Sequence, residues 1–153
     1  MNVKKLTFLS IYTALLVVFA YFLKIPTPTG VVTLLDAGIF LAALNFSNPI
    51  YVAGVAGGSA FIFDLLSGYP QWMFFSLIIH GLQGYFAYKK PTWLGFSLAT
   101  IVMVVGYFIV TFFMYGMAGA IEGIVPNLLQ NIVGIVVALL INKLVEGLKL
   151  KWI

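Results

Sequence analysis

The sequence predicts an all-α integral membrane protein, a bundle of six transmembrane helices with both termini in the cytoplasm. The chain is 63% hydrophobic and only 8% charged, whereas soluble domains are about 45–50% apolar and about 25% charged. Its 153 residues leave room for about six or seven crossings of about 20 residues each. Its lysines lie mainly at the ends of apolar segments, as membrane topology requires. Residues 1–153 are therefore expected to form a single transmembrane domain.

The composition excludes several classes of function. The net charge of +4 is not accompanied by a basic face interleaved with aromatic residues, so nucleic-acid binding is not expected. The chain has no cysteine and one histidine, so we expect neither a metal site nor a cofactor. It carries no Gly-rich phosphate loop and no paired-histidine motif, so we expect that it is not an enzyme and cannot hydrolyse ATP alone.

Six apolar segments follow one another, separated by breaks rich in proline, glycine or lysine. The first has a basic start at Lys4 and Lys5, as a signal peptide has, but no clean small-x-small cleavage site follows, so we expect an uncleaved helix. The third is rich in small residues, which allow close helix approach. The predicted helices cover residues 6–23, 31 or 36 to 46, 50–66, 71–88, 93–115 and 123–144, with a loop over 116–122.

The second segment is short, because about 16 residues extend only about 24 Å as a helix. Lysine placement indicates that it nevertheless crosses the membrane. If it crosses, Lys24 is the one lysine on the outer side; if it does not, Lys4 and Lys5 oppose all the others, which is a weaker bias. The lysines predicted on the inner side are Lys4, Lys5, Lys89, Lys90, Lys143, Lys149 and Lys151.

This topology gathers three of the four acids, Asp36, Asp64 and Glu122, at the outer face. Asp36 and Glu122 begin helices, where the helix dipole favours a negative charge, so capping explains them as well as ligand contact does. Asp64 ends a helix, where the dipole is unfavourable. We therefore expect Asp64 to have a specific partner, either Lys24 or a ligand.

Further polar residues line the outer halves of the later helices. Asn127, Gln130 and Asn131 are spaced three and four apart and so share a face, which is either an interhelical hydrogen-bond cluster or a ligand surface. His80 lies close to mid-membrane, where it either bridges helices as a neutral side chain or contacts a ligand. Gln71, Trp72 and Tyr115 lie near the outer interface, where an aromatic belt is the alternative explanation for the two rings.

Three stretches of the chain carry a family resemblance. They are Lys24-Ile25-Pro26-Thr27-Pro28, the run over residues 35–43, and Gly57-Gly58-Ser59-Ala60 with Asp64 to Tyr69. In this order they resemble the S components of energy-coupling factor (ECF) vitamin transporters, in the riboflavin-transporter-like branch. That branch includes small members assigned to hydroxymethylpyrimidine or pyridoxine.

The resemblance implies a six-helix substrate-binding subunit in the prokaryotic plasma membrane. Such a subunit captures a vitamin from outside, associates with a membrane coupling (T) subunit and two cytoplasmic ATPases, and topples in the membrane to release its cargo. The family's Ala-x-x-x-Ala docking motif on the first helix corresponds here to Ser10 and Ala14. Where relatives carry Lys-Gly-x-x-Gly on the fourth helix, this chain has His80-Gly81-Leu82-Gln83-Gly84, which puts charge pairing there in doubt.

The charges narrow the expected cargo. Anionic vitamins need a cation to hold their carboxylate, and this chain has no arginine and only Lys24 on the outer side. The sequence therefore favours a neutral or cationic heteroaromatic, with a hydroxymethylpyrimidine- or pyridoxine-like ligand ahead of thiamine or riboflavin. The expected lid is Pro26, Thr27, Pro28, Thr29 and Gly30; the expected ligand contacts are Asp36, Asp64, Gln71, Trp72, His80, Tyr115, Glu122, Asn127, Gln130 and Asn131.

Two other functions fit the same helices. A stand-alone carrier coupled to protons would use Asp64 or Glu122, and would need neither ATP nor partner subunits. A structural membrane protein without a ligand would use its polar helix faces for packing alone. An intramembrane aspartyl protease fits less well, because Asp36 and Asp64 lie at helix ends rather than within helices.

Overall fold

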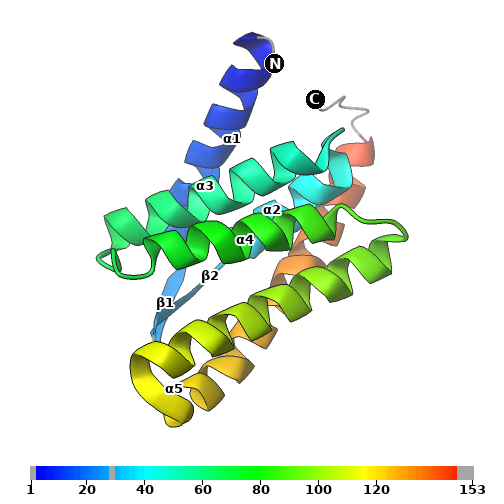
Figure 1. Ribbon diagram of the computed structural model, residues 1–153. Helices are drawn as coiled ribbons and strands as arrows, with labels where there is room; N and C mark the ends of the chain where they lie inside the picture. The colour runs from blue at the N-terminus through cyan, green and yellow to red at the C-terminus, as the bar shows by residue number, and fades with distance from the viewer. Residues whose placement is uncertain (1–2, 28–29, 148–153) are drawn as a thin grey trace.

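The structure is a computed structural model that describes residues 3–27 and 30–147 of the chain. Pro28 and Thr29 of the expected lid, and Lys149 and Lys151 of the basic tail, lie outside the described residues. The described part is built mainly from apolar helices (Figure 1). The elements are α1 (Val3–Phe22), β1 (Lys24–Thr27), β2 (Gly30–Thr33), α2 (Leu35–Asn45), α3 (Pro49–Ser67), α4 (Met73–Ala87) and α5 (Thr92–Gly147).

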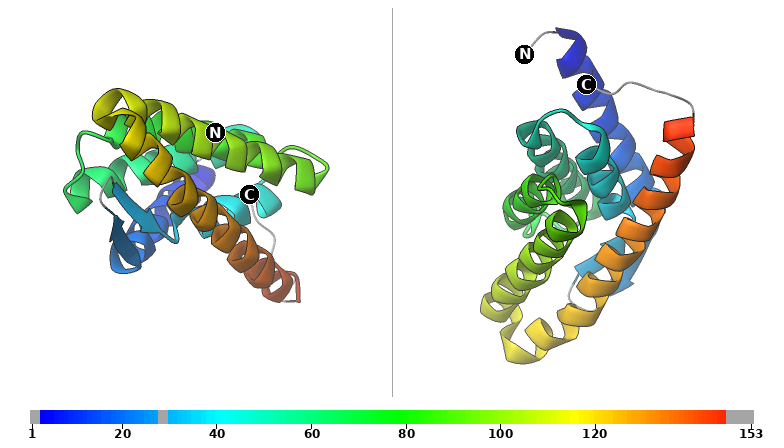
Figure 2. Two further views of the ribbon diagram at one scale, coloured as in Figure 1. Left: turned by 90° about the horizontal axis from the view of Figure 1, so that it is seen from below. Right: turned by 90° about the vertical axis from the view of Figure 1, so that its right-hand side faces the viewer.

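The long element α5 bends sharply at Gly116, which has φ 78° and ψ −177°. Glycine adopts such a positive φ without the steric cost of a Cβ. Figure 1 and the right view of Figure 2 show two arms that run back from this bend and spread apart as they leave it. We call residues 92–115 the first arm and 117–147 the second arm. The predicted loop over 116–122 was wrong, because within α5 only Gly116 leaves helical geometry and residues 117–122 are helical.

The segment between α1 and α2 forms a β-hairpin, which the all-α prediction did not include. β1 and β2 pair antiparallel, with Lys24 opposite Thr33 and Thr27 opposite Gly30. The β-branched run Val31-Val32-Thr33 favours extended backbone. The second helix therefore begins at Leu35, and the alternative start at residue 31 was wrong.

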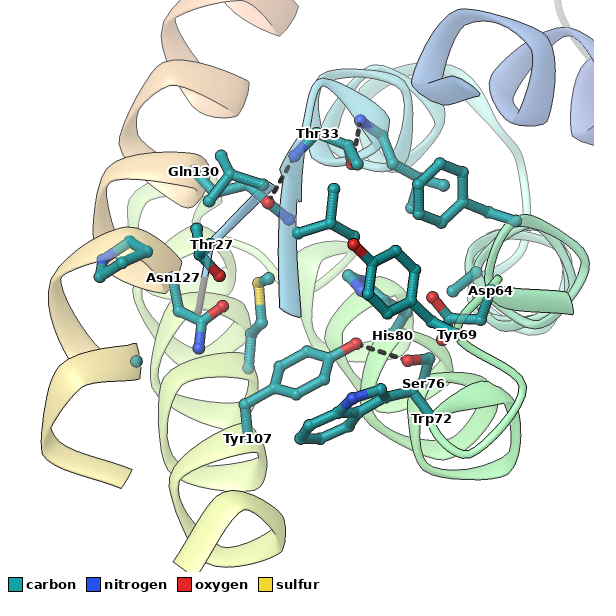
Figure 3. A pocket seen from close by; sticks show the side chains of 18 of the residues that line it. Thr27, Thr33, Asp64, Tyr69, Trp72, Ser76, His80, Tyr107, Asn127 and Gln130 are labelled. Carbon is teal, nitrogen blue, oxygen red and sulfur yellow. Dashed lines mark hydrogen bonds between the residues drawn. The ribbon is translucent and has the colours of Figure 1, made fainter. Parts of the chain in front are cut away.

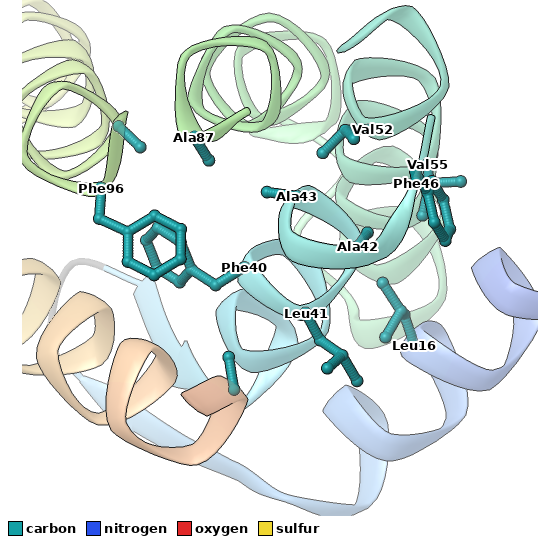
Figure 4. Close-up of a cluster of buried hydrophobic side chains, with 12 residues drawn as sticks. Leu16, Phe40, Leu41, Ala42, Ala43, Phe46, Val52, Val55, Ala87 and Phe96 are labelled. Carbon is teal, nitrogen blue, oxygen red and sulfur yellow. The ribbon is translucent and has the colours of Figure 1, made fainter. Parts of the chain in front are cut away.

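The helix α2 lies at the centre of the core. Its residues 35–43 are all buried, as expected for a helix that is apolar on every side. Figure 4 shows side chains of α1, α3 and α5 around it, including Leu16, Val52 and Phe96. The ring of Phe40 packs on that of Phe96 with their centroids 4.8 Å apart.

The outer surface is apolar. The helices α1, α3 and α5 are long and apolar enough to cross a membrane, whereas α2 and α4 are apolar but shorter. Large apolar side chains on these helices are exposed, Phe22 by 78% and Phe113 by 80%. Such a surface is an aggregation liability in water, and it suits the hydrocarbon core of a bilayer.

Glycines bring α3 and α4 into close contact. A Cβ added at Gly57 would lie 2.5 Å from the carbonyl oxygen of Leu77, and a Cβ at Gly81 would lie 4.0 Å from the Cα of Gly57. The neighbouring Gly58 has no atom within 4 Å of such a Cβ. Gly57 is therefore needed for packing inside the bundle, and Gly58 is not.

The first prediction compares these two glycines. Gly57→Ala should lower the free energy of unfolding by about 1–3 kcal/mol, because α3 and α4 must separate. Gly58→Ala, the matched control, should leave stability unchanged or raise it by about 0.5–1 kcal/mol, because alanine favours a helix. Thermal unfolding in detergent measures both, and an equal loss in the two variants would contradict the packing.

Candidate functional site

A polar cavity lies between the hairpin, the end of α3, α4 and both arms of α5 (Figure 3). The volume open to the centres of water-sized molecules is about 70 Å³. Among the described residues that line it there is no lysine or arginine. Its polar and aromatic wall residues include Thr27, Thr33, Asp64, Tyr69, Trp72, Ser76, His80, Tyr107, Thr111, Asn127 and Gln130.

Helical spacing explains how these side chains come together. Residues four apart lie on the same face of a helix. Trp72, Ser76 and His80 follow this spacing at the start of α4 and along it. Met103, Tyr107 and Thr111 follow it on the first arm, and Gly123, Asn127 and Gln130 lie three or four apart on the second arm. The cavity is thus bounded by one face each of α4 and the two arms, with the hairpin beside them.

Buried hydrogen bonds form the floor of the cavity. The carboxylate of Asp36, fully buried in the first turn of α2, accepts hydrogen bonds from Gln83 Nε2 at 2.5 Å and from Gln130 Nε2. Gln83 Nε2 also donates to Asn131 Oδ1 at 2.9 Å, and Gln83 Oε1 lies 2.7 Å from His80 Nδ1. His80 Nδ1 is 3.8 Å from Asp36 Oδ1. One carboxylate therefore joins α2, α4 and the second arm.

The same network holds the hairpin. The backbone N–H of Thr33 in β2 donates to Gln130 Oε1 at 2.7 Å, while Gln130 Nε2 donates to Asp36 (Figure 3 shows the Thr33 contact). The amide of Gln130 thus links the hairpin to the buried acid.

Aromatic rings form another part of the wall. The Trp72 ring lies 5.7 Å from that of Tyr107 and is stacked on Tyr115, with centroids 6.0 Å apart. The Tyr107 hydroxyl is 2.7 Å from Ser76 Oγ, and its ring meets His80 edge-on. A flat heteroaromatic ligand would find stacking surfaces here.

The structure brings together about half of the residues predicted from the sequence. Asp64, Trp72, His80, Asn127, Gln130 and the lid residue Thr27 line the cavity. Five others do not. Asp36 and Asn131 are buried beneath the cavity, and Gln71 and Glu122 are exposed. Tyr115 stacks on Trp72 outside the cavity wall. Of the other lid residues, Pro26 lies in β1 without lining the cavity, and Gly30 begins β2.

Lys24 is not the partner expected for Asp64. Its ammonium lies over the ring of Tyr21, 4.1 Å from the centroid, and among the described residues no ion pair joins it to Asp64.

Sequence reasoning also missed Ser76, Tyr107 and Thr111. Their four-residue spacing from Trp72 or from each other was the available signal, but it becomes informative only once the facing helix is known.

Among the described residues, no three His, Asp or Glu side chains gather in a group that could hold a metal ion. An apolar groove does lie between α1 and α3. Ser10 and Ala14, the predicted docking residues, line it together with Gly54 and Gly58. A Cβ added at either glycine would meet nothing within 4 Å.

Comparisons with known proteins agree with this architecture. The family described as "ECF-type riboflavin transporter, S component" matches residues 1–146. The "Thiamine precursor transporter HmpT" of Lactococcus lactis subsp. cremoris (strain MG1363) is 46% identical over 149 residues, covering 95% of this chain and 89% of that protein. An "Uncharacterized protein in gap 3'region" of Pyrococcus woesei is 34% identical over 123 residues, covering 75% and 82%.

The second prediction concerns the buried acid. Asp36→Asn should lower the free energy of unfolding by about 1–3 kcal/mol, because the new amide group opposes the donors of Gln83 and Gln130. The control Glu122→Gln, at an exposed acid, should change it by less than about 0.5 kcal/mol. Thermal unfolding of the ligand-free protein measures both. Equal stability of Asp36→Asn and the wild type would show that the network does not support the fold.

Proposed function

Because the chain belongs to the family of ECF-type riboflavin transporter S components, we propose that it captures a small heteroaromatic vitamin precursor at the outer face of a membrane and delivers it through a coupling subunit. The family is one of transporters, so the chain is not an enzyme. The resemblance seen in the sequence is thereby confirmed. The proposed cargo is a pyrimidine of the hydroxymethylpyrimidine type, which the name of the Lactococcus relative, a thiamine precursor transporter, supports.

The observation that carries this choice of cargo is the chemistry of the cavity wall. An anionic vitamin needs a cation beside its carboxylate. The described wall offers amides, hydroxyls, aromatic rings and the acid Asp64, but no lysine or arginine. The small volume, about 70 Å³ for the centres of water-sized molecules, favours one ring over the three fused rings of a flavin.

The proposed topology has six crossings, with both arms of α5 counted separately. In Figure 1 the start of α1, the end of α5 and the connections at 46–48 and 88–91 lie toward the upper right. The hairpin, the α3–α4 turn and the bend at Gly116 lie toward the lower left. Lys4, Lys5, Lys89 and Lys90 therefore share an end of the molecule and Lys24 lies at the other, as the positive-inside rule expects for an outward cavity in the plasma membrane.

The groove between α1 and α3 is the proposed docking surface for a helix of the coupling (T) subunit, with two ATPases on the cytoplasmic side. Small residues allow helices to approach closely in lipid. Gly54 and Gly58 have open space where a side chain would stand, so packing within the chain does not require glycine there. With Ser10 and Ala14 they form the small-residue face that an external helix needs.

The third prediction tests capture. Hydroxymethylpyrimidine should bind the purified chain with submicromolar affinity and change its tryptophan fluorescence, because Trp72 lines the cavity. The change should disappear in Trp72→Phe and persist in Trp93→Phe, whose indole is 70% exposed. If pantothenate or biotin binds and every neutral or cationic vitamin fails, the charge argument is wrong.

The fourth prediction separates capture from delivery. Ala14→Leu and Gly58→Leu should leave ligand binding intact but strongly reduce uptake in cells that contain the coupling subunit and the ATPases, because the new side chains fill the groove. The matched control Ala118→Leu, at an exposed position outside the groove, should retain uptake. Loss of binding in the groove variants would contradict docking there. Uptake by the purified chain alone under a proton gradient would support the stand-alone carrier.

A further inference from the structure

The cavity wall contains two buried polar atoms whose hydrogen-bonding capacity is unused. Within the described residues, three buried side-chain atoms have no hydrogen-bond partner: Asp64 Oδ2, Ser67 Oγ and Trp72 Nε1. Asp64 and Trp72 line the cavity and are each only 6% exposed. Leaving a buried polar group unpaired destabilises a protein, more so when the group is charged.

Asp64 differs in its surroundings from the other buried acid. Asp36 stands in the first turn of α2, where the dipole favours it, and its two oxygens have amide donors. Asp64 stands in the last turn of α3, where the dipole is unfavourable, and no described lysine pairs with it. Its Oδ2 lacks a hydrogen-bond donor.

The two unused atoms have opposite hydrogen-bonding roles. An ionised carboxylate only accepts hydrogen bonds, and an indole N–H only donates them. Figure 3 shows both side chains on one side of the cavity, with Ser76 between them in that view. A ligand that satisfies them presents a donor to Asp64 and an acceptor to Trp72.

We propose that Asp64 and Trp72 together select the cargo by its hydrogen-bonding edge, with an exocyclic amine or protonated ring nitrogen donating to Asp64 Oδ2 and an acceptor on the same ligand receiving Trp72 Nε1–H. This inference rests on the proposed function and specifies which edge of an aminopyrimidine is recognised. An amine beside a ring nitrogen carries both groups. The acid at the end of α3 is thus a specificity residue, whereas Asp36 holds the fold.

The test is a thermodynamic cycle of two ligands and two proteins. The ligands are 4-amino-5-hydroxymethyl-2-methylpyrimidine and its analogue with hydrogen in place of the amine. In the wild type, loss of the amine should weaken binding about ten- to hundredfold, as expected for a hydrogen bond to a charged group. In Asp64→Leu the two ligands should bind equally. An equal penalty for amine loss in both proteins would overturn the role of Asp64.

Two further measurements complete the test. Trp72→Phe keeps an aromatic side chain, though a smaller one, and removes the indole N–H, so it should weaken the binding of both ligands severalfold while the amine preference persists. Unchanged affinity would remove Trp72 from the proposal. Ligand-free Asp64→Leu should unfold at the wild-type temperature or above, because an unpaired buried carboxylate is removed, and a fall of several degrees would show a structural role instead. If the wild type binds neither pyrimidine while Asp64→Leu keeps its stability, the proposed function fails. The proposed role of Asp64 in selecting the cargo then fails as well.

Discussion

The buried carboxylate of Asp36 is the constraint on which the arrangement of the other elements depends. A fully buried carboxyl group, inside a protein with an apolar surface, requires hydrogen-bond partners. Gln83 on α4 and Gln130 on the second arm supply them. The second arm reaches Asp36 because it has Gly134 at the contact, where an added Cβ would lie 2.8 Å from the Cβ of Asp36. The acid therefore fixes how α2, α4 and α5 meet.

That constraint divides the site into two parts. In the floor of the cavity, the side-chain amide of Gln83 is hydrogen-bonded to both Asp36 and Asn131, and His80 joins them through Gln83. Such a completed network specifies one arrangement of the helices. Above, the wall near Asp64 keeps polar atoms without protein partners. This division would suit the proposed binding function, since the floor would be preorganised before a ligand arrives and the upper wall would be completed by it.

The sequence predicted the class of protein and its polar residues better than their individual roles. Composition alone required a lipid environment, because no soluble fold hides so many apolar side chains. The sequence already separated Asp36, at the start of a helix, from Asp64, at the end of one, but it left open which of them contacts a ligand. What separates them is the facing helix, which places Gln83 beside Asp36 and no lysine beside Asp64. Ser76 and Tyr107 were missed for the same reason: their hydrogen bond joins α4 to the first arm across 31 positions of sequence. The hairpin and the single-residue bend at Gly116 depended on local backbone geometry that hydropathy does not encode.

Gln130 connects the buried acid to the hairpin beside the cavity. Its carbonyl oxygen accepts the Thr33 N–H, so β2 stays against the second arm for as long as Gln130 also donates to Asp36. Outward movement of the hairpin would break the Thr33 contact and leave part of the Gln130 amide unpaired. On the proposed function, a family described by its riboflavin transporters would gain a one-ring cargo in this chain through the position of one hairpin rather than through a new fold.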